Sequence, residues 1–136
     1  MAAAAQARAL VDSILGADPA ARIAVMGDLN DDPFDKSIRE TLGADSLAGT
    51  ERLFNPFASI LGEGRGTLSY KGRWNLFDQV ILSPGILKTE GKLSYIPGSA
   101  AIYSPQWMCV DEGRSKGVPK RTFSAGKWFE EGFSDH

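Results

Sequence analysis

The strongest constraint on the fold is a helix-type pattern followed closely by a strand-type pattern near the start of the chain. Apolar side chains recur at helical spacing within an alanine-rich segment: Leu10, Val11, Ile14 and Leu15. This spacing predicts a helix over residues 2–16, ended by Gly16 and Pro19. The short apolar run over residues 22–26 then predicts a buried strand. The chain therefore begins as a helix that leads into a sheet.

A second helix is predicted soon after this strand. Residues 28–33 are polar and contain a proline, so we expect a loop there. Asp35 is a suitable N-cap for a helix over residues 36–42, and Gly43 is a suitable end for it.

From residue 67 onward the pattern changes to strands. Residues 67–70 and 74–82 predict a hairpin around a short Gly-containing turn. Residues 93–96 and 100–103 predict further short strands, and the polar stretch 112–127 predicts a surface loop. Helices that precede strands in this way indicate a mixed α/β layer fold.

Composition limits the classes of function. The 136 residues suit one domain, and their formal net charge of −2 argues against a broadly basic nucleic-acid binder. Cys109 is the only cysteine, which excludes an intramolecular disulfide and a cysteine-based zinc cluster. No stretch approaches the roughly 20 apolar residues that a membrane span needs.

The first motif with chemical potential is the acidic loop Gly27-Asp-Leu-Asn-Asp-Asp-Pro33. It follows the predicted strand directly, and α/β folds place ligands at the carboxyl ends of strands. Its hard oxygen atoms suit magnesium, manganese or calcium better than zinc. The alternative interpretation is a turn that only caps the following helix.

The second motif places an acidic residue inside an apolar strand. Asp78 lies between Leu76-Phe77 and Val80-Ile-Leu82, shortly after Thr67 in the sequence. A carboxylate in this position must be paired or solvated at a cleft, because an unpaired buried charge is costly. The alternative is an aspartate at a strand edge that faces water.

The third motif is Ser134-Asp-His136, which contains the only histidine of the chain. Any imidazole acid–base chemistry must therefore use His136. The alternative is a solvent-exposed histidine in a tail.

The three motifs in this order resemble the endonuclease/exonuclease/phosphatase superfamily, which has the DNase I-like fold. The likeness covers nearly the whole chain from residue 7 and rests on Gly27-Asp-Leu-Asn30, Phe77-Asp-Gln79 and Ser134-Asp-His136. It implies a four-layered α/β sandwich that hydrolyses phosphodiester or phosphomonoester bonds with a divalent metal, Mg²⁺ or alternatively Mn²⁺ or Ca²⁺.

The resemblance also implies a role for each motif residue. Asp28 would orient or deprotonate the attacking water, and Asn30 would hold the scissile phosphate or assist that water. Asp135 would contribute to the metal site, and His136 would contact the phosphate oxygens in the transition state. Asp78 would hydrogen-bond His136 and fix its tautomer.

Two more residues are candidates for substrate contacts. Thr67 belongs to a Gly66–Tyr70 segment that also resembles the family. Arg121 lies in a basic window near the third motif and is a candidate for a structural or substrate contact. A solvated basic loop is the alternative for that window.

The family fold is longer than this chain, and its N-terminal half supplies a metal-binding glutamate, a phosphate-contacting asparagine and often another histidine. We therefore expect residues 1–136 to form the C-terminal half of such a domain, truncated at both ends. The missing N-terminal half would be its partner, and the fragment would be inactive alone.

The class of substrate stays open between nucleic acid, a phospholipid headgroup and a small phosphate ester. The acidic balance favours small or lipid-linked esters over bulk DNA. The compartment is also open, and resemblance to bacterial members, many of them secreted, allows a secreted or periplasmic parent. The alternative function is a non-catalytic interaction module on the same fold.

Overall fold

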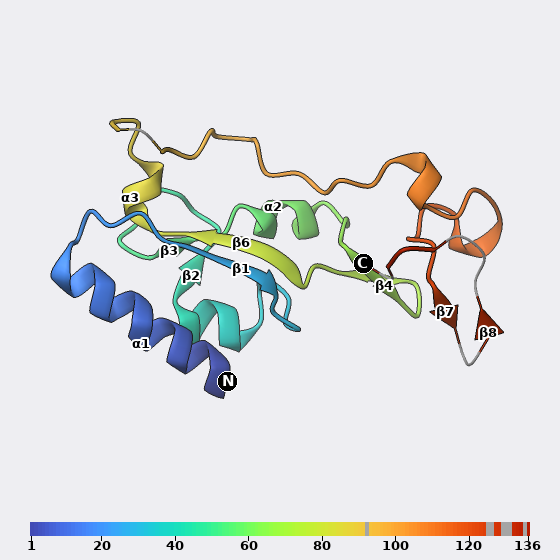
Figure 1. The fold of residues 1–136 in the computed structure, drawn as a ribbon, viewed down its shortest axis with the longest axis horizontal. Helices are drawn as coiled ribbons and strands as arrows, with labels where there is room; N and C mark the ends of the chain where they lie inside the picture. The colour runs from blue at the N-terminus through green and yellow to red at the C-terminus, as the bar shows by residue number, and fades with distance from the viewer. Residues whose placement is uncertain (92, 125–126, 129–131, 135) are drawn as a thin grey trace.

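The computed structural model describes residues 1–91, 93–124, 127–128, 132–134 and 136 (Figure 1). Within them the elements follow in the order α1 (Ala2–Ala17), β1 (Ala24–Asp28), η1 (Ser37–Leu42), β2 (Ala44–Asp45), β3 (Leu53–Phe54), α2 (Phe57–Gly62), β4 (Leu68–Tyr70), β5 (Arg73–Asn75), β6 (Asp78–Leu82), α3 (Pro84–Leu87), η2 (Gln106–Met108), η3 (Gly113–Ser115), β7 (Phe123–Ser124) and β8 (Lys127–Trp128). Helices and strands are mixed, which confirms the predicted α/β class.

A four-stranded sheet with the order β1-β6-β3-β2 organises the first part of the chain. Strands β1 and β6 are antiparallel and pair from Ala24 opposite Leu82 to Asp28 opposite Asp78. Strand β1 has one neighbour only, so it forms an edge of this sheet.

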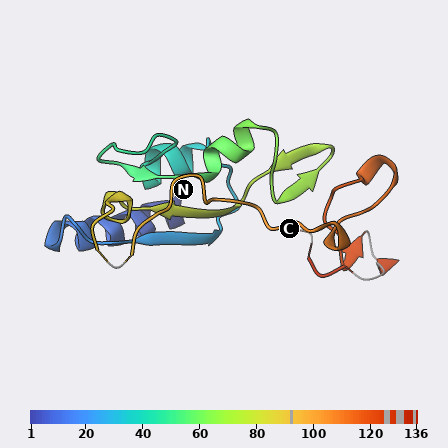
Figure 2. The ribbon, with the colours of Figure 1, turned by 90° about the horizontal axis from the view of Figure 1, so that it is seen from above.

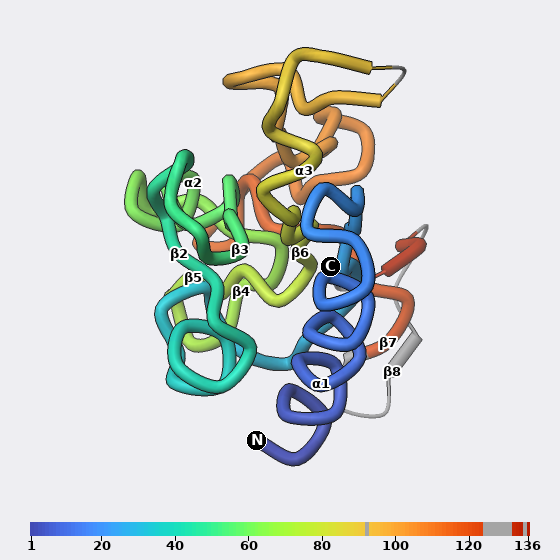
Figure 3. Tube along the Cα trace, turned by 90° about the vertical axis from the view of Figure 1, so that its left-hand side faces the viewer, coloured from blue at the N-terminus to red at the C-terminus, as the bar shows by residue number. Residues whose placement is uncertain are grey.

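The two faces of the sheet are covered by different elements. Ile81 of β6 packs in a cluster with Val11 of α1 and Ile38 of η1. Leu82, the next residue of β6, packs with Ile86 of α3 on the opposite face. Figures 1 and 3 accordingly show α1 and α3 on opposite sides of β6.

The predicted first helix is confirmed as α1. Ala4 and Ala7 are partly buried against the core around Val11, and their small side chains let the helix approach the neighbouring η1 closely. Arg8 reinforces this contact by donating a hydrogen bond from Nη1 to the carbonyl of Leu42, at 3.2 Å.

The second helix ends as predicted but begins differently. Gly43 closes η1 with φ of 79°, and its N–H donates to the carbonyl of Ile38 five residues back, a π-type turn. The prediction of Asp35 as N-cap was wrong, because its carboxylate accepts the N–H of Asp32 at 2.7 Å instead.

The prediction that the first strand is buried was also wrong. Strand β1 begins two residues later than expected and is exposed at most positions, with Met26 65% exposed. The physical reason is its position at the edge of the sheet, where α1 covers only the face that carries Val25.

The predicted hairpin is present as β4 and β5, joined by a tight turn with positive φ at Lys71 and Gly72. The expected continuous strand over residues 74–82 is interrupted. It breaks after Asn75, because the N–H of Leu76 donates to the carboxylate of Asp32 and not to a strand partner.

Residues 93–96 and 100–103 were predicted as strands, and this prediction was wrong: their backbone is irregular. Tyr95 is tied to the sheet region by its N–H, which donates to the carbonyl of Ile86 at 2.8 Å. From there the chain runs away from α3 toward β7 and β8 (Figure 2). We call residues 1–91 the layered region, and the described residues from 93 to 136 the arm.

Within the described part of the chain, none of the helices combines the length and the apolar character that crossing a bilayer demands.

Candidate functional site

Two aspartates meet at one end of the β1–β6 pair. Asp28 and Asp78 are direct partners in the register, and the N–H of Leu29 donates to the carbonyl of Phe77 just beyond them. Side chains of directly opposed residues lie on the same face of a sheet. Because like charges in this position repel each other, a proton donor or a cation at this face is favourable.

Asp78 has such donors. Its Oδ2 accepts the hydroxyl of Thr67 at 2.5 Å and lies 2.7 Å from Nδ1 of His136. The side chains of His136 and Asp78 are 22% and 41% exposed, so the contact lies at a cleft edge and not in the core. His136 is therefore paired and half-buried, unlike a histidine in a solvated tail.

The Gly27–Asn30 turn presents Asp28 beside this pair. Asn30 has φ of 53°, and its N–H donates to Oδ1 of Asp28 at 2.9 Å. Gly27 has φ of 143°, which side-chain-bearing residues rarely adopt. The turn fixes the direction of an exposed carboxylate at the end of β1.

The next two aspartates of the loop hold the structure together. Asp31 accepts the hydroxyl of Ser37 at 2.6 Å, and Asp32 accepts the N–H of Leu76 at 2.6 Å. Burial raises the pKa of Asp32 above its ordinary value, and the neighbouring Asp35 and Asp31 add to this effect. Asp31 and Asp32 thus make structural contacts to other elements, whereas the exposed carboxylate of Asp28 bonds only within its own turn among the described contacts.

A buried amide network beneath the site was not foreseen from the sequence. Gln79, 2% exposed, accepts a hydrogen bond from Nδ2 of Asn55 at 2.7 Å. Its own amide group donates to the carbonyl of Asp31 at 2.6 Å and to that of Leu76 at 2.9 Å. Successive side chains of a strand point to opposite faces, so Gln79 lies on the face of β6 that is turned away from Asp78. The network therefore anchors the acidic loop from behind the site.

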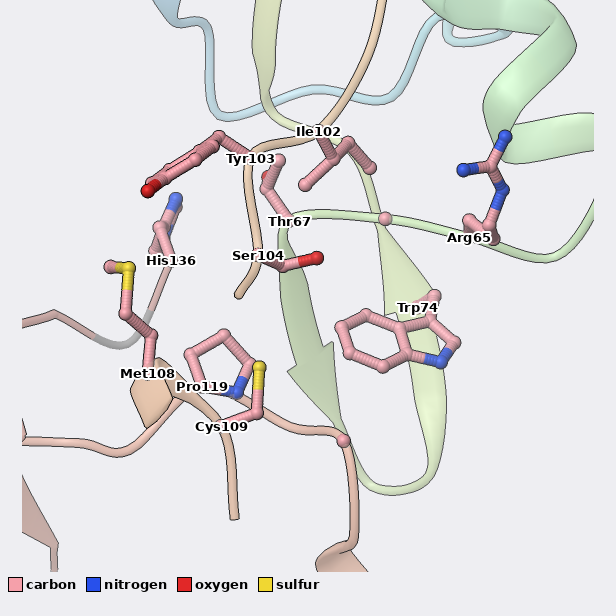
Figure 4. A pocket seen from close by; sticks show the side chains of 12 residues that line it. Arg65, Thr67, Trp74, Ile102, Tyr103, Ser104, Met108, Cys109, Pro119 and His136 are labelled. Carbon is pink, nitrogen blue, oxygen red and sulfur yellow. The ribbon is translucent and has the colours of Figure 1, made fainter. Parts of the chain in front are cut away.

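A cavity of about 210 Å³ adjoins His136 and Thr67 (Figure 4). The base of the hairpin provides one wall, with Gly66, Thr67 and Trp74. Arg65 also lines the space, and the arm contributes Ile102, Tyr103, Ser104, Met108, Cys109, Gly117 and Pro119 together with His136. Nothing in the sequence pattern of these arm residues marks them as a pocket.

Gly66 is required where the hairpin closes on itself. A Cβ atom there would overlap the backbone of Asn75, whose carbonyl accepts the N–H of Thr67 at 2.9 Å. This close approach fixes Thr67 at the rim of the pocket, within reach of Asp78.

The other predicted residues are placed less directly. Arg121 is half-buried and donates from Nη2 to the carbonyl of Ser69 at 3.2 Å, so its observed contact is structural. Asp135 lies outside the described residues.

The sequence profile of the Endonuclease/Exonuclease/phosphatase family matches residues 1–136. The chain belongs to this family. Its mixed α/β structure is consistent with the DNase I-like fold of the family, and family membership indicates hydrolase activity on phosphoesters in general. No curated protein and no solved structure matches the chain.

Members of the family generally use divalent metals. Among the described residues, however, no group of three or more His, Cys, Asp or Glu side chains could hold a metal ion. The described acidic pair at the site is Asp28 and Asp78, and Asp78 already accepts two hydrogen-bonding partners. The described residues alone therefore do not form a complete metal site.

Proposed function

We propose that this site hydrolyses a phosphodiester or phosphomonoester bond by attack of an activated water in the presence of a divalent metal. One observation supports the proposal above the others: Thr67, Asp78 and His136 form a hydrogen-bonded chain beside Asp28. Hydrogen-bond donors and acceptors held in this way match the needs of an anionic transition state.

Each residue has a distinct part in this proposal. Asp78 and Thr67 are positioning residues, because the carboxylate holds Nδ1 of His136 and leaves the other ring nitrogen for a phosphate oxygen. The exposed Asp28 would orient the attacking water or take its proton, and Asn30 would hold the phosphate or assist the water.

A divalent cation in the site would supply positive charge that offsets the charge developing on the phosphate. We propose that Asp28 and Asp135 contribute ligands to Mg²⁺, Mn²⁺ or Ca²⁺, and that further ligands come from a second segment of the family fold. This second segment would be the N-terminal half implied by the family resemblance, and residues 1–136 alone would then be inactive.

The metal part of the proposal can be tested on this chain by NMR with Mn²⁺. We expect paramagnetic broadening of the amide signals of residues 27–30 and of the ring signals of His136, and weaker broadening in Asp28→Asn. The matched control is Asp18→Asn, an exposed aspartate whose carboxylate accepts the N–H of the nearby Ala20. If the broadening were the same in Asp28→Asn as in the parent chain, the assignment of Asp28 as a metal ligand would be contradicted.

The proposed catalysis is tested by a hydrolysis assay on the full-length natural protein that contains residues 1–136. With bis(p-nitrophenyl) phosphate we expect turnover that requires Mg²⁺, stops with EDTA and falls about 100-fold or more in His136→Ala. Turnover indifferent to His136→Ala would sink the proposal. Absence of both metal binding and turnover would favour the alternative, a non-catalytic interaction module on the same fold.

A further inference from the structure

The pocket beside His136 has a chemical character different from that of the acidic site. Its lining is mostly apolar, and Trp74, Ile102, Met108, Cys109 and Pro119 surround the space (Figure 4). Among the residues that the structure describes, no acidic side chain lines it, and Thr67, Ser104 and Tyr103 provide neutral hydroxyl groups. Such a pocket favours an uncharged group and disfavours a cation.

Arg65 is the one permanently charged residue among the described lining residues, and it does not change this conclusion. Arg65 already pairs with Glu63, with Nη2 and Oε2 2.7 Å apart, and both side chains are largely exposed at the outer rim. Its charge is therefore screened by solvent and compensated by a carboxylate. The described interior lining therefore carries no permanent charge that a ligand would need to match.

The pocket and the proposed hydrolytic site share two residues. His136 and Thr67 line the pocket and are also the two partners of Asp78. A phosphate held by His136 would thus place one of its ester substituents directly at the pocket mouth. We propose that this pocket takes an uncharged aromatic ring carried by the phosphoester, a proposal that rests on the proposed function of the same site.

The flat surfaces of the pocket favour a ring over an extended chain. Trp74 offers an indole, and Tyr103, 80% exposed, places a phenol ring beside His136 at the mouth (Figure 4). Aromatic rings gain additional stabilisation from edge-to-face or offset contacts with such side chains. The cavity of about 210 Å³ also has room for a single ring system.

The proposal can be tested by titrating the intact chain, in the presence of Mg²⁺, with inorganic phosphate, phenyl phosphate, n-hexyl phosphate and phenol. His136 is the only histidine, so its two carbon-bound ring protons give unambiguous NMR signals that report on the site. We expect phenyl phosphate to bind at least about tenfold tighter than inorganic phosphate, because ring burial adds to phosphate contacts. Hexyl phosphate binding tighter than phenyl phosphate, or equal binding of all phosphates, would overturn the proposal.

Ser104→Phe provides the structural test, since Ser104 is an exposed arm residue that faces the cavity. The added ring should fill the pocket and remove the advantage of phenyl phosphate while leaving the affinity for inorganic phosphate within about twofold. Ser99→Phe is the matched control, on the same segment but outside the pocket lining, and should retain the advantage. An advantage that survives Ser104→Phe would contradict the assignment of the pocket.

The two proposals fail in different ways. If inorganic phosphate does not perturb His136 at any concentration, the proposed function is contradicted at that residue. The ring proposal is then decided by phenol alone: saturable shifts at Trp74 and Met108 that Ser104→Phe abolishes would support the pocket. Absence of those shifts would overturn it.

Discussion

The layered region and the arm differ in how they are held. In the layered region, Val11, Leu53 and Ile81 belong to an apolar cluster between α1, η1 and the sheet. In the described part of the arm, Cys109 is the only buried hydrophobic residue. Folding stability and site formation therefore have different sources. The apolar cluster stabilises the layered region, whereas the site forms where the layered region meets the arm.

The arm is attached to the layered region by local contacts spread along its length. Tyr95 packs against Phe54 with ring centroids 5.6 Å apart, Arg121 bonds the carbonyl of Ser69, and His136 bonds Asp78. Segments with few buried apolar contacts open at lower free energy than the global unfolding. We therefore expect the site to be lost by local opening before the layered region unfolds.

The largest effect should come from the core of the layered region. Ile81→Ala removes a fully buried side chain between α1 and the sheet and should lower the free energy of unfolding by about 2–5 kcal/mol. Urea denaturation followed by circular dichroism measures this change. Met26→Ala, on the exposed side of β1, is the control and should stay within about 0.5 kcal/mol. If Ile81→Ala lowered the free energy of unfolding by less than Met26→Ala does, the comparison between the two regions would be contradicted.

The second effect concerns the amide network beneath the site. Gln79→Met keeps the approximate shape but leaves the Asn55 amide and the Asp31 carbonyl without this partner. Unsatisfied buried polar groups cost about 1–3 kcal/mol each, so we expect a loss of about 2 kcal/mol or more in urea denaturation. The same substitution at the exposed Gln6 of α1 should have almost no effect.

The third effect should be nearly invisible in global stability. Asp78→Asn weakens the attachment of His136, and we expect the free energy of unfolding to change by less than about 1 kcal/mol. Limited proteolysis of the arm should nevertheless become several-fold faster, and the His136 ring signal should shift. Asp111→Asn is the control, because its Lys120 partner lies within the arm. Equal proteolysis of both variants would show that the Asp78–His136 contact does not hold the arm.

The smallest effect is a pH dependence within the acidic loop. The pKa of Asp32 is raised in the folded state, so the folded state holds its proton more tightly than the unfolded state does. The stability that protonated Asp32 contributes is fully present below its ordinary pKa of about 3.9. It is lost as the pH rises from that value through the raised pKa of the folded state. Asn can still accept the Leu76 N–H without a charge.

Asp32→Asn should accordingly match or slightly exceed the parent in unfolding free energy at neutral pH, by up to about 0.5 kcal/mol. The difference should vanish at pH values below about 3.9, where both states of the parent are protonated. Thermal unfolding at several pH values measures it. A variant that is clearly less stable at neutral pH would show that the charged form of Asp32 strengthens the loop.

The sequence predicted local elements wherever periodicity or turn chemistry acts between neighbours. Helical spacing identified α1, and the Lys71-Gly72 turn identified the β4–β5 hairpin. It failed where distant segments compete for backbone groups. Asp32 captures the N–H of Leu76 and interrupts the expected strand, and the edge position of β1 leaves Met26 exposed.

The acidic loop, the intrastrand aspartate and the only histidine were determined by the sequence itself, because residue type and spacing are properties of the chain. The family resemblance already implied the contact between Asp78 and His136, which lie 58 residues apart. Only the tertiary structure decided that Asp28 faces Asp78 across two strands. It also decided that Ile102, Met108 and Pro119 of the arm close a pocket beside them. The physical reason is that register and docking depend on which surfaces bury each other, and this information is not contained in any local pattern.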